Sequence, residues 1–204
     1  MSNDVHVVNG GKGPRFAQRV DEQGRAFGIV DSLDSEEWAA RRGDSFILHG
    51  ECHLAAATAG ALMYYENDSD DYLVAIGRVY VDAHSLSDDI IIRQAYDPTR
   101  ANGTAITATG IVQKHRRKPT TGLPGTLHIS DGSSDMTFSA NGTRYHGFTI
   151  SSLESIERDM HGTNILGKGD GIGWDWATVD GANGVDAEII SLSVNCYRFK
   201  ADEI

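Results

Sequence analysis

The stretch from Gly60 to Pro98 contains three consecutive strand patterns with little chain between them. The segments are ALMYYE, YLVAIGRVYVDA and DIIIRQAYD, separated by the turn NDSDD and the polar break HSLSD. A strand with one buried face requires an apolar residue at every second position, because successive side chains point to opposite faces. The stretch therefore predicts three strands in a row. The residues predicted to share one face of the middle strand are Leu73, Ala75, Gly77, Val79 and Val81.

Further short strand patterns follow this stretch along the chain, among them TAITATGIVQ, and they are separated by glycine-rich turns such as SDGSSD. The last of them is VDAEIISLSVNCYRFK, in which one face is predicted to carry Ile190, Leu192, Val194, Cys196 and Arg198. A regular succession of short strands is typical of an all-β sandwich or barrel, and 204 residues suffice for one such domain. We expect an extended N-terminal arm over residues 1–31 and a single β domain over residues 32–204.

Two segments favour short helices. In SLDSEEWAARRG, Ser32 or Asp34 can cap the first turn and Gly43 suits the left-handed stop. In SSLESIERDMHG the apolar residues are spaced by three and four, and Ser151 with Glu154 forms a possible capping box. A helix is the prediction for this second segment, with a strand as the alternative.

The chain is acidic, with a formal net charge of −11, which argues against free duplex nucleic acid as a partner. One basic block, Lys114–Lys118, stands out and suggests docking on an acidic neighbour, with a solvated loop as the plain alternative. No signal peptide or membrane span is recognisable in the sequence. Two distant cysteines, Cys52 and Cys196, predict reduced and buried thiols in a protein made in the cytoplasm.

Several motifs have both a chemical and a plain reading. The Asn67–Asp71 turn is rich in the oxygen ligands of calcium, but its spacing differs from that of an EF-hand and a solvated hairpin is expected. His49, Glu51 and His53 would share one face of a strand, as in some metal enzymes of β-barrel fold, or form an ordinary surface. The glycine run from Gly167 to Gly173 has a spacing like that of phosphate-binding loops. Such a loop requires a helix after it, which this sequence lacks, so a turn before a strand is expected.

Trp174 and Trp176 alternate in the sequence WDW, with Asp175 directed to the opposite side. Such aromatic pairs can form a sugar-binding platform, but a place in the core or at a subunit contact is favoured. No serine, cysteine or carboxylate arrangement carries a catalytic signature, so no catalytic residue, metal or cofactor is assigned.

The order of the segments SEEWAARRGDSFILHGE, ALMYYENDSDDYLVAIGRVYVDA, IIIRQAYDPTRANGTAITATGIVQKHRRK, LHISDGSSDMTFS and NILGKGDGIGWDW resembles the small jelly-roll structural proteins of tailed bacteriophage virions. The resemblance covers most of the chain after about Ser32. The residues that match its pattern are Tyr65, Asn67, Tyr96, Asp97, Pro98, Gly167 and Gly169.

This resemblance implies a jelly-roll-like antiparallel β-sandwich that acts as a head decoration protein, without enzymatic activity. Such a protein is often a homotrimer, and it would bind the major capsid protein and stabilise the capsid surface of the virion. The residues expected to dock lie in the arm and in the basic block: Val5, His6, Val7, Lys12, Arg15, Lys114, His115, Arg116, Arg117 and Lys118. Two alternatives are a tail, baseplate or fibre component that binds a tail partner or a host glycan, and a cupin-like metal-dependent enzyme.

Overall fold

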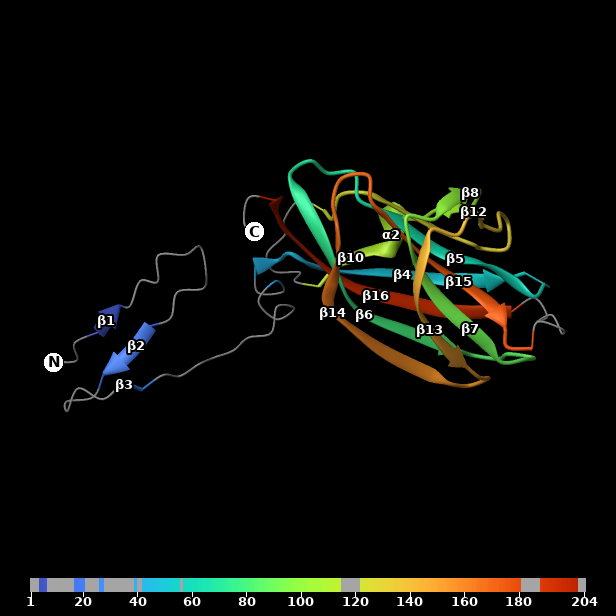
Figure 1. Ribbon diagram of the computed structural model, residues 1–204, viewed down its shortest axis with the longest axis horizontal. Helices are drawn as coiled ribbons and strands as arrows, with labels where there is room; N and C mark the ends of the chain where they lie inside the picture. Colours follow the sequence, from blue (N-terminus) through green and yellow to red (C-terminus); the bar gives the residue numbers. More distant parts are fainter. Residues whose placement is uncertain are drawn as a thin grey trace.

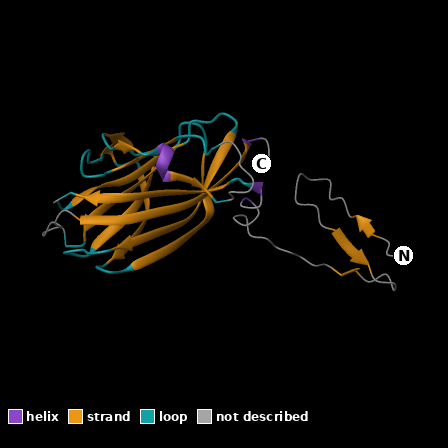
Figure 2. Ribbon diagram, turned by 180° about the vertical axis from the view of Figure 1, so that it is seen from behind, coloured by secondary structure: helices purple, strands orange, loops and turns teal. Residues whose placement is uncertain are grey.

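Two antiparallel sheets packed face to face form the body of the protein (Figure 1). The computed structural model describes residues 4–6, 17–20, 26–27, 39, 42–55, 57–114, 122–180 and 188–201. Figure 2 shows that strands make up nearly all of this body, so the prediction of an all-β sandwich is confirmed. The eight long strands are β4 (Ser45–Leu54), β5 (Ala59–Glu66), β6 (Tyr72–Ala83), β7 (Ile90–Tyr96), β13 (Thr143–Ile150), β14 (Ser155–Leu166), β15 (Gly171–Thr178) and β16 (Glu188–Lys200).

The eight long strands pair from the outside of the sequence inward. β4 pairs with β16, β5 with β15, β6 with β14 and β7 with β13, and every pair is antiparallel. The five-stranded sheet has the order β10-β4-β16-β6-β14, and the six-stranded sheet has the order β13-β7-β15-β5-β11-β9. The chain therefore behaves as one long folded hairpin whose four strand pairs are divided between two layers.

Short elements complete the two sheets and connect them. β9 lies in the six-stranded sheet and β10 in the five-stranded sheet, so the single helical turn α2 between them is the crossover from one layer to the other. The continuous strand predicted over TAITATGIVQ is therefore wrong, because the chain changes sheets there. These elements are β9 (Thr104–Ala105), α2 (Thr107–Gly110), β10 (Ile111–Gln113) and β11 (Thr126–Ile129).

The core lies between the two sheets and consists mainly of apolar side chains. Ile190, Leu192, Val194 and Cys196 of β16 are all fully buried in it, as the alternation in that segment predicts. The adjacent Ile189 is half exposed on the outer face. Burying one such aliphatic side chain contributes roughly 1.5–3 kcal/mol, so the inward faces supply most of the stabilisation.

The predicted inward face of β6 is correct for only part of the strand. Val79 and Val81 lie in the core, but in the first half of the strand it is Val74 and Ile76 that point inward. Two residues of β6, at positions 77 and 78, stand opposite the single residue Asn195 of β16, which is a β-bulge. The bulge shifts the alternation by one, so Leu73 and Ala75 belong to the outer face.

The helix predicted over SSLESIERDMHG is wrong, and the alternative reading as a strand is correct. From Ser155 onward this segment is β14, which pairs with β6 along the edge of the five-stranded sheet. The predicted capping contact does form, since the amide of Ser151 donates to the Glu154 carboxylate at 2.8 Å, but it closes a turn. Pairing with a long neighbouring strand outweighs the weak helical preference of the sequence.

A small two-stranded flap covers part of the outer face of the six-stranded sheet. It consists of β8 (Thr99–Ala101) and β12 (Thr137–Ala140). Phe138 and Met136 pack there against Tyr64 and Ala61 in a second apolar cluster, with the rings of Tyr64 and Phe138 6.3 Å apart. Gly173 leaves room for the flap, because a Cβ at that position would lie 2.6 Å from the Phe138 ring.

The described parts of the N-terminal region form a separate sheet of three short strands. Its order is β1-β2-β3, and among the described strands these three pair only with one another. Their bounds are β1 (Asp4–His6), β2 (Ala17–Val20) and β3 (Ala26–Phe27). The division into an arm over residues 1–31 and a domain over residues 32–204 stays a prediction. In the other predicted helix, Ala39 and Arg42 are helical and Gly43 has the expected left-handed φ of 83°.

Candidate functional site

The residues that carried the resemblance meet at one end of the sandwich. The side chain of Asn67 donates to the carbonyls of Tyr72 and Leu166, at 2.9 and 3.0 Å, and so ties two loops together. The Asp97 carboxylate accepts a hydrogen bond of 2.7 Å from the amide of Gly171, which joins the end of β7 to the start of β15. Both residues therefore fix the positions of loops.

The acidic turn at the same end is a surface turn, but the expected hairpin is wrong, because this turn connects β5 of the six-stranded sheet to β6 of the five-stranded sheet. Asp70 pairs with Lys168 at 2.7 Å, and the Ser69 hydroxyl accepts from the amides of Asp71 and Tyr72. Across the described ranges no group of three or more His, Cys, Asp or Glu residues is placed to hold a metal ion. The glycine run is likewise a turn that leads into β15, as the sequence predicted.

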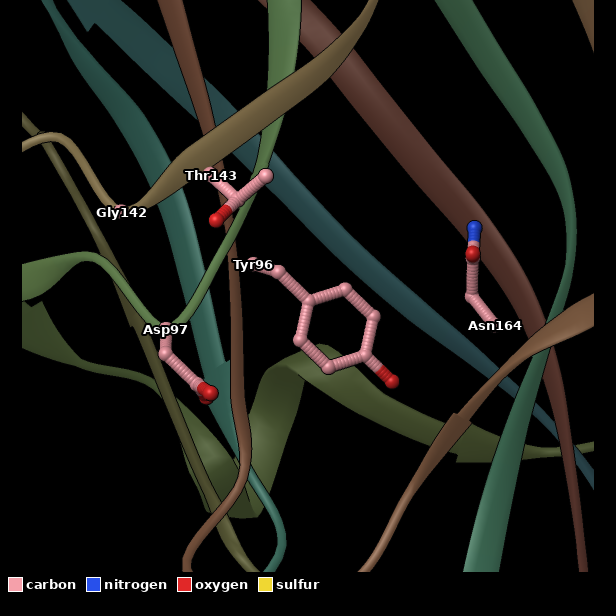
Figure 3. Close-up of a pocket in the computed structure, with 5 residues that line it drawn as sticks. All are labelled: Tyr96, Asp97, Gly142, Thr143 and Asn164. Atoms are coloured by element: carbon pink, nitrogen blue, oxygen red, sulfur yellow. The ribbon is translucent and has the colours of Figure 1, made fainter.

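A pocket of about 530 Å³ opens beside this end, between the edges of the two sheets (Figure 3). Tyr96 ends β7, Thr143 begins β13, and Asn164 lies in β14. Asp97 and Gly142 are the other described residues of the lining, and the space is open to solvent.

The ring of Tyr96 forms the centre of the pocket and is held firmly. Its hydroxyl donates to the carbonyl of Ile165 at 2.6 Å. Burial raises the pKa of this phenol, and the negative charges of Asp170 and Asp97 raise it further. The hydroxyl therefore remains protonated at neutral pH, and the surroundings of the ring are electrostatically negative.

The predicted histidine face exists on the outside of the five-stranded sheet. His49 and Glu51 are exposed on β4, and their partners are serines of β16: His49 Nδ1 lies 2.8 Å from Ser193 Oγ, and Ser191 donates to Glu51 at 2.8 Å. His53, farther along β4, instead pairs with Asp135 at 3.3 Å. The side chains share a face, but within the described part of the chain they do not converge on a metal position.

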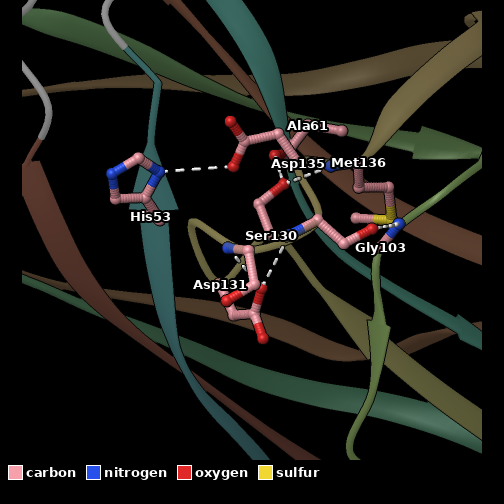
Figure 4. A network of polar contacts seen from close by, with 9 residues as sticks. His53, Ala61, Gly103, Ser130, Asp131, Asp135 and Met136 are labelled. Carbon is pink, nitrogen blue, oxygen red and sulfur yellow. Dashed lines mark hydrogen bonds and ion pairs between the residues drawn. The ribbon is translucent and has the colours of Figure 1, made fainter.

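A network of polar contacts links the two sheets near His53 (Figure 4). The buried Ser130 hydroxyl donates to the carbonyl of Ala61 and accepts from the amide of Met136, both at 2.7 Å. The Asp131 carboxylate accepts from the amides of residues 133 and 134, and a hydrogen bond from Thr104 is the main cause that lowers its pKa. The Ser130 hydroxyl both donates and accepts a hydrogen bond within the protein. The network of Ser130, His53, Asp131 and Asp135 therefore holds a loop in place.

Trp174 and Trp176 are fully buried in the core, so the prediction of a core position is confirmed and the sugar platform is wrong. Asp175 points to the opposite face, as the sequence implied. There it pairs with Arg93 at 2.8 Å and with Arg144. The alternation gave the direction of Asp175, but no local signal identified its two arginine partners.

Most of the residues predicted to dock lie outside the described residues, namely Val7, Lys12, Arg15 and His115–Lys118. Val5 and His6 lie in β1, where the backbone alone is described. The Lys114 amide donates to the carbonyl of Ser45 at 3.0 Å, so the basic block leaves the five-stranded sheet beside the start of β4. The structure therefore shows where this block begins, and its docking role stays a prediction.

Comparisons of the chain with protein-family models, with curated proteins and with solved structures give no match. No helix among the described residues is long and apolar enough to cross a membrane.

Proposed function

We propose that this chain is a non-enzymatic structural protein of a tailed-phage virion, a head decoration protein that binds the major capsid protein and stabilises the lattice. The observation that supports this proposal is the hydrogen-bonded loop end. Asn67, Asp97 and the turn that begins at Gly167 belong to the pattern that carries the resemblance, and they lie together and fix the same loops.

The strand order supports the finer part of the proposal, a jelly-roll sandwich. Numbered along the chain, the eight long strands give the sheet orders 1-8-3-6 and 2-7-4-5. Four nested antiparallel pairs folded into two layers are what a double Greek-key arrangement of eight strands requires. A rigid body of this kind presents its loops and its N-terminal segment to a neighbouring surface. Self-association as a homotrimer on the capsid surface belongs to the same proposal.

The test is a reconstitution with capsids. Recombinant protein is added to phage capsids that lack it, and the bound copies are counted after sedimentation. We expect saturable binding, together with a trimer mass from light scattering of the free protein. Particles that bind no protein would refute the lattice role.

A charge-reversal variant tests the basic block within the same assay. Changing Arg116, Arg117 and Lys118 to Glu is expected to remove binding, because an acidic partner would then repel this loop. The matched control reverses three charges elsewhere, on the partly exposed Arg78 and on the exposed Arg158 and Lys168. Equal binding by both variants would show that the block does not dock.

A further inference from the structure

The pocket beside Tyr96 is open to solvent and has the size of a small-molecule site. Its volume of about 530 Å³ is within the range of ligand pockets, roughly 300–1,000 Å³. Its described lining comes from three separate parts of the chain, namely the end of β7 with Asp97, the start of β13 with Gly142, and β14. Each of these parts is anchored in a sheet or in a hydrogen-bonded turn.

The walls of the pocket offer hydrogen-bond donors and acceptors on either side of the Tyr96 ring (Figure 3). Asp97 is exposed and uses one carboxylate oxygen for the amide of Gly171, so its other oxygen can accept. Thr143 is exposed and can both donate and accept. On the other side of the ring, the side-chain nitrogen of Asn164 (Nδ2) has no hydrogen-bond partner within the part of the chain that the structure describes.

The charge of the site limits the class of ligand. Asp97 lines the pocket, and Asp170 lies near enough to Tyr96 that, after burial, the charges of Asp170 and Asp97 both raise the pKa of the phenol. None of the described residues that line the pocket is a lysine or an arginine. A phosphate or carboxylate ligand would therefore be repelled, and the site suits a ligand without negative charge.

The combination of groups matches the surface of a sugar. A pyranose ring has an apolar face of C–H groups that can lie against an aromatic ring, and hydroxyl groups that each donate and accept. The Tyr96 ring is held by its hydrogen bond to Ile165, and Asp97, Thr143 and Asn164 supply acceptor, mixed and donor groups around it. We propose that this pocket binds an uncharged saccharide.

The site is also preorganised, which favours binding of a small ligand. Gly142 has a φ of 57°, and a Cβ there would lie 2.0 Å from the Tyr96 carbonyl, so this turn is pressed against the end of β7. The saccharide would find Asp97 and Thr143 already in place. This site is separate from the buried tryptophans and from the basic block, so it adds a binding activity to the proposed structural role.

The experiment is a binding screen on the full chain with named sugars. Glucose, galactose, mannose and N-acetylglucosamine are each added at up to about 20 mM and followed by saturation-transfer NMR, and the best is then titrated by calorimetry. We expect at least one to bind with a Kd of roughly 1 mM, the strength typical of a small polar ligand in an open site. N-acetylneuraminic acid, which is anionic, is expected to bind at least tenfold more weakly.

Variants decide whether the pocket is the site. Thr143→Val and Asn164→Leu are each expected to weaken binding about tenfold, and Tyr96→Ala to remove it, while Tyr96→Phe keeps the ring and most of the affinity. Thr149→Val changes an exposed threonine on the same strand and is the matched control. Circular dichroism checks that each variant is folded.

Absence of binding by all four neutral sugars would overturn the inference, and so would binding that Thr143→Val and Asn164→Leu leave unchanged. Tighter binding of the anionic sugar would overturn the argument from charge. None of these results bears on capsid binding, so the two proposals fail independently.

Discussion

Removing the carboxylate of Asp175 should destabilise the protein, because it breaks a buried cluster of ion pairs. Asp175 is 3% exposed on the outer face of the six-stranded sheet. It accepts from Arg93 Nε at 2.8 Å and from Arg144 Nε at 3.0 Å, with a further contact to Arg144 Nη2. These contacts join three neighbouring strands, β15, β7 and β13. Asp175→Ala leaves two guanidinium groups side by side without their shared anion.

The magnitude follows from the burial of the three groups. Breaking a buried ion pair from one side costs about 3–5 kcal/mol. The two arginine side chains are 27% and 35% exposed, so they can recover part of their hydration, which lowers the expected cost. We expect the free energy of unfolding to fall by about 2–3 kcal/mol, equivalent to roughly 5–10 °C in Tm for a domain of this size.

Urea titration at pH 7 measures this loss directly. Trp174 and Trp176 flank Asp175 in the core, so their fluorescence reports the unfolding of the same strand. Asp159→Ala is the control, because its ion pair with Arg78 is long, at 3.6 Å, and more than a third exposed on both sides. That change is expected to cost no more than about 0.5 kcal/mol. If the two variants lose the same stability, the reasoning from burial is refuted.

Three further predictions concern strain, thiols and pH. Leu153 is 83% exposed with a φ of 60°, so Leu153→Gly should raise the free energy of unfolding by about 0.5–1 kcal/mol in urea titration; a loss would contradict this. Burial raises the pKa of the Cys52 and Cys196 thiols, so neither should react with Ellman's reagent at pH 8 until urea unfolds the chain, and rapid labelling of the native protein would be inconsistent with the core described. Burial and the charge of Arg100 lower the pKa of His128, so the contribution of His128 to stability is complete above about pH 6.5 and declines as the pH falls. The variant His128→Gln should therefore flatten the dependence of the free energy of unfolding on pH below about pH 6.5. An unchanged slope in that range would show that the lowered pKa of His128 is not its cause.

The sequence predicted the strands of the Gly60–Pro98 region closely, because a period of two is a local property of the chain. It did not predict which face of β6 points inward throughout. Residues 73–76 are apolar at every position, so the pattern there is compatible with either face. The bulge opposite Asn195 determines which side chains of β6 point inward. It depends on how β16 aligns with β6, and no local sequence pattern shows that alignment.

The error over β14 has a similar cause. Its first half carries Glu, Arg, Asp and Met, which suit a helix at least as well as a strand. This segment forms a strand because it pairs with β6, which lies far away in the sequence. The pocket was missed for the same reason, since Tyr96, Thr143 and Asn164 come from three strands and form no motif along the chain.

The pairing of β4 with β16 has a consequence for how the protein forms during synthesis. β16 is the central strand of the five-stranded sheet, where it lies between β4 and β6. On a ribosome, β4 and β6 emerge long before β16 does, and their facing edges remain without a partner in the meantime. Contacts of such long range make folding slow, and exposed strand edges invite pairing with other chains. We therefore expect the nascent protein to depend on protection from aggregation until its last strand has been made.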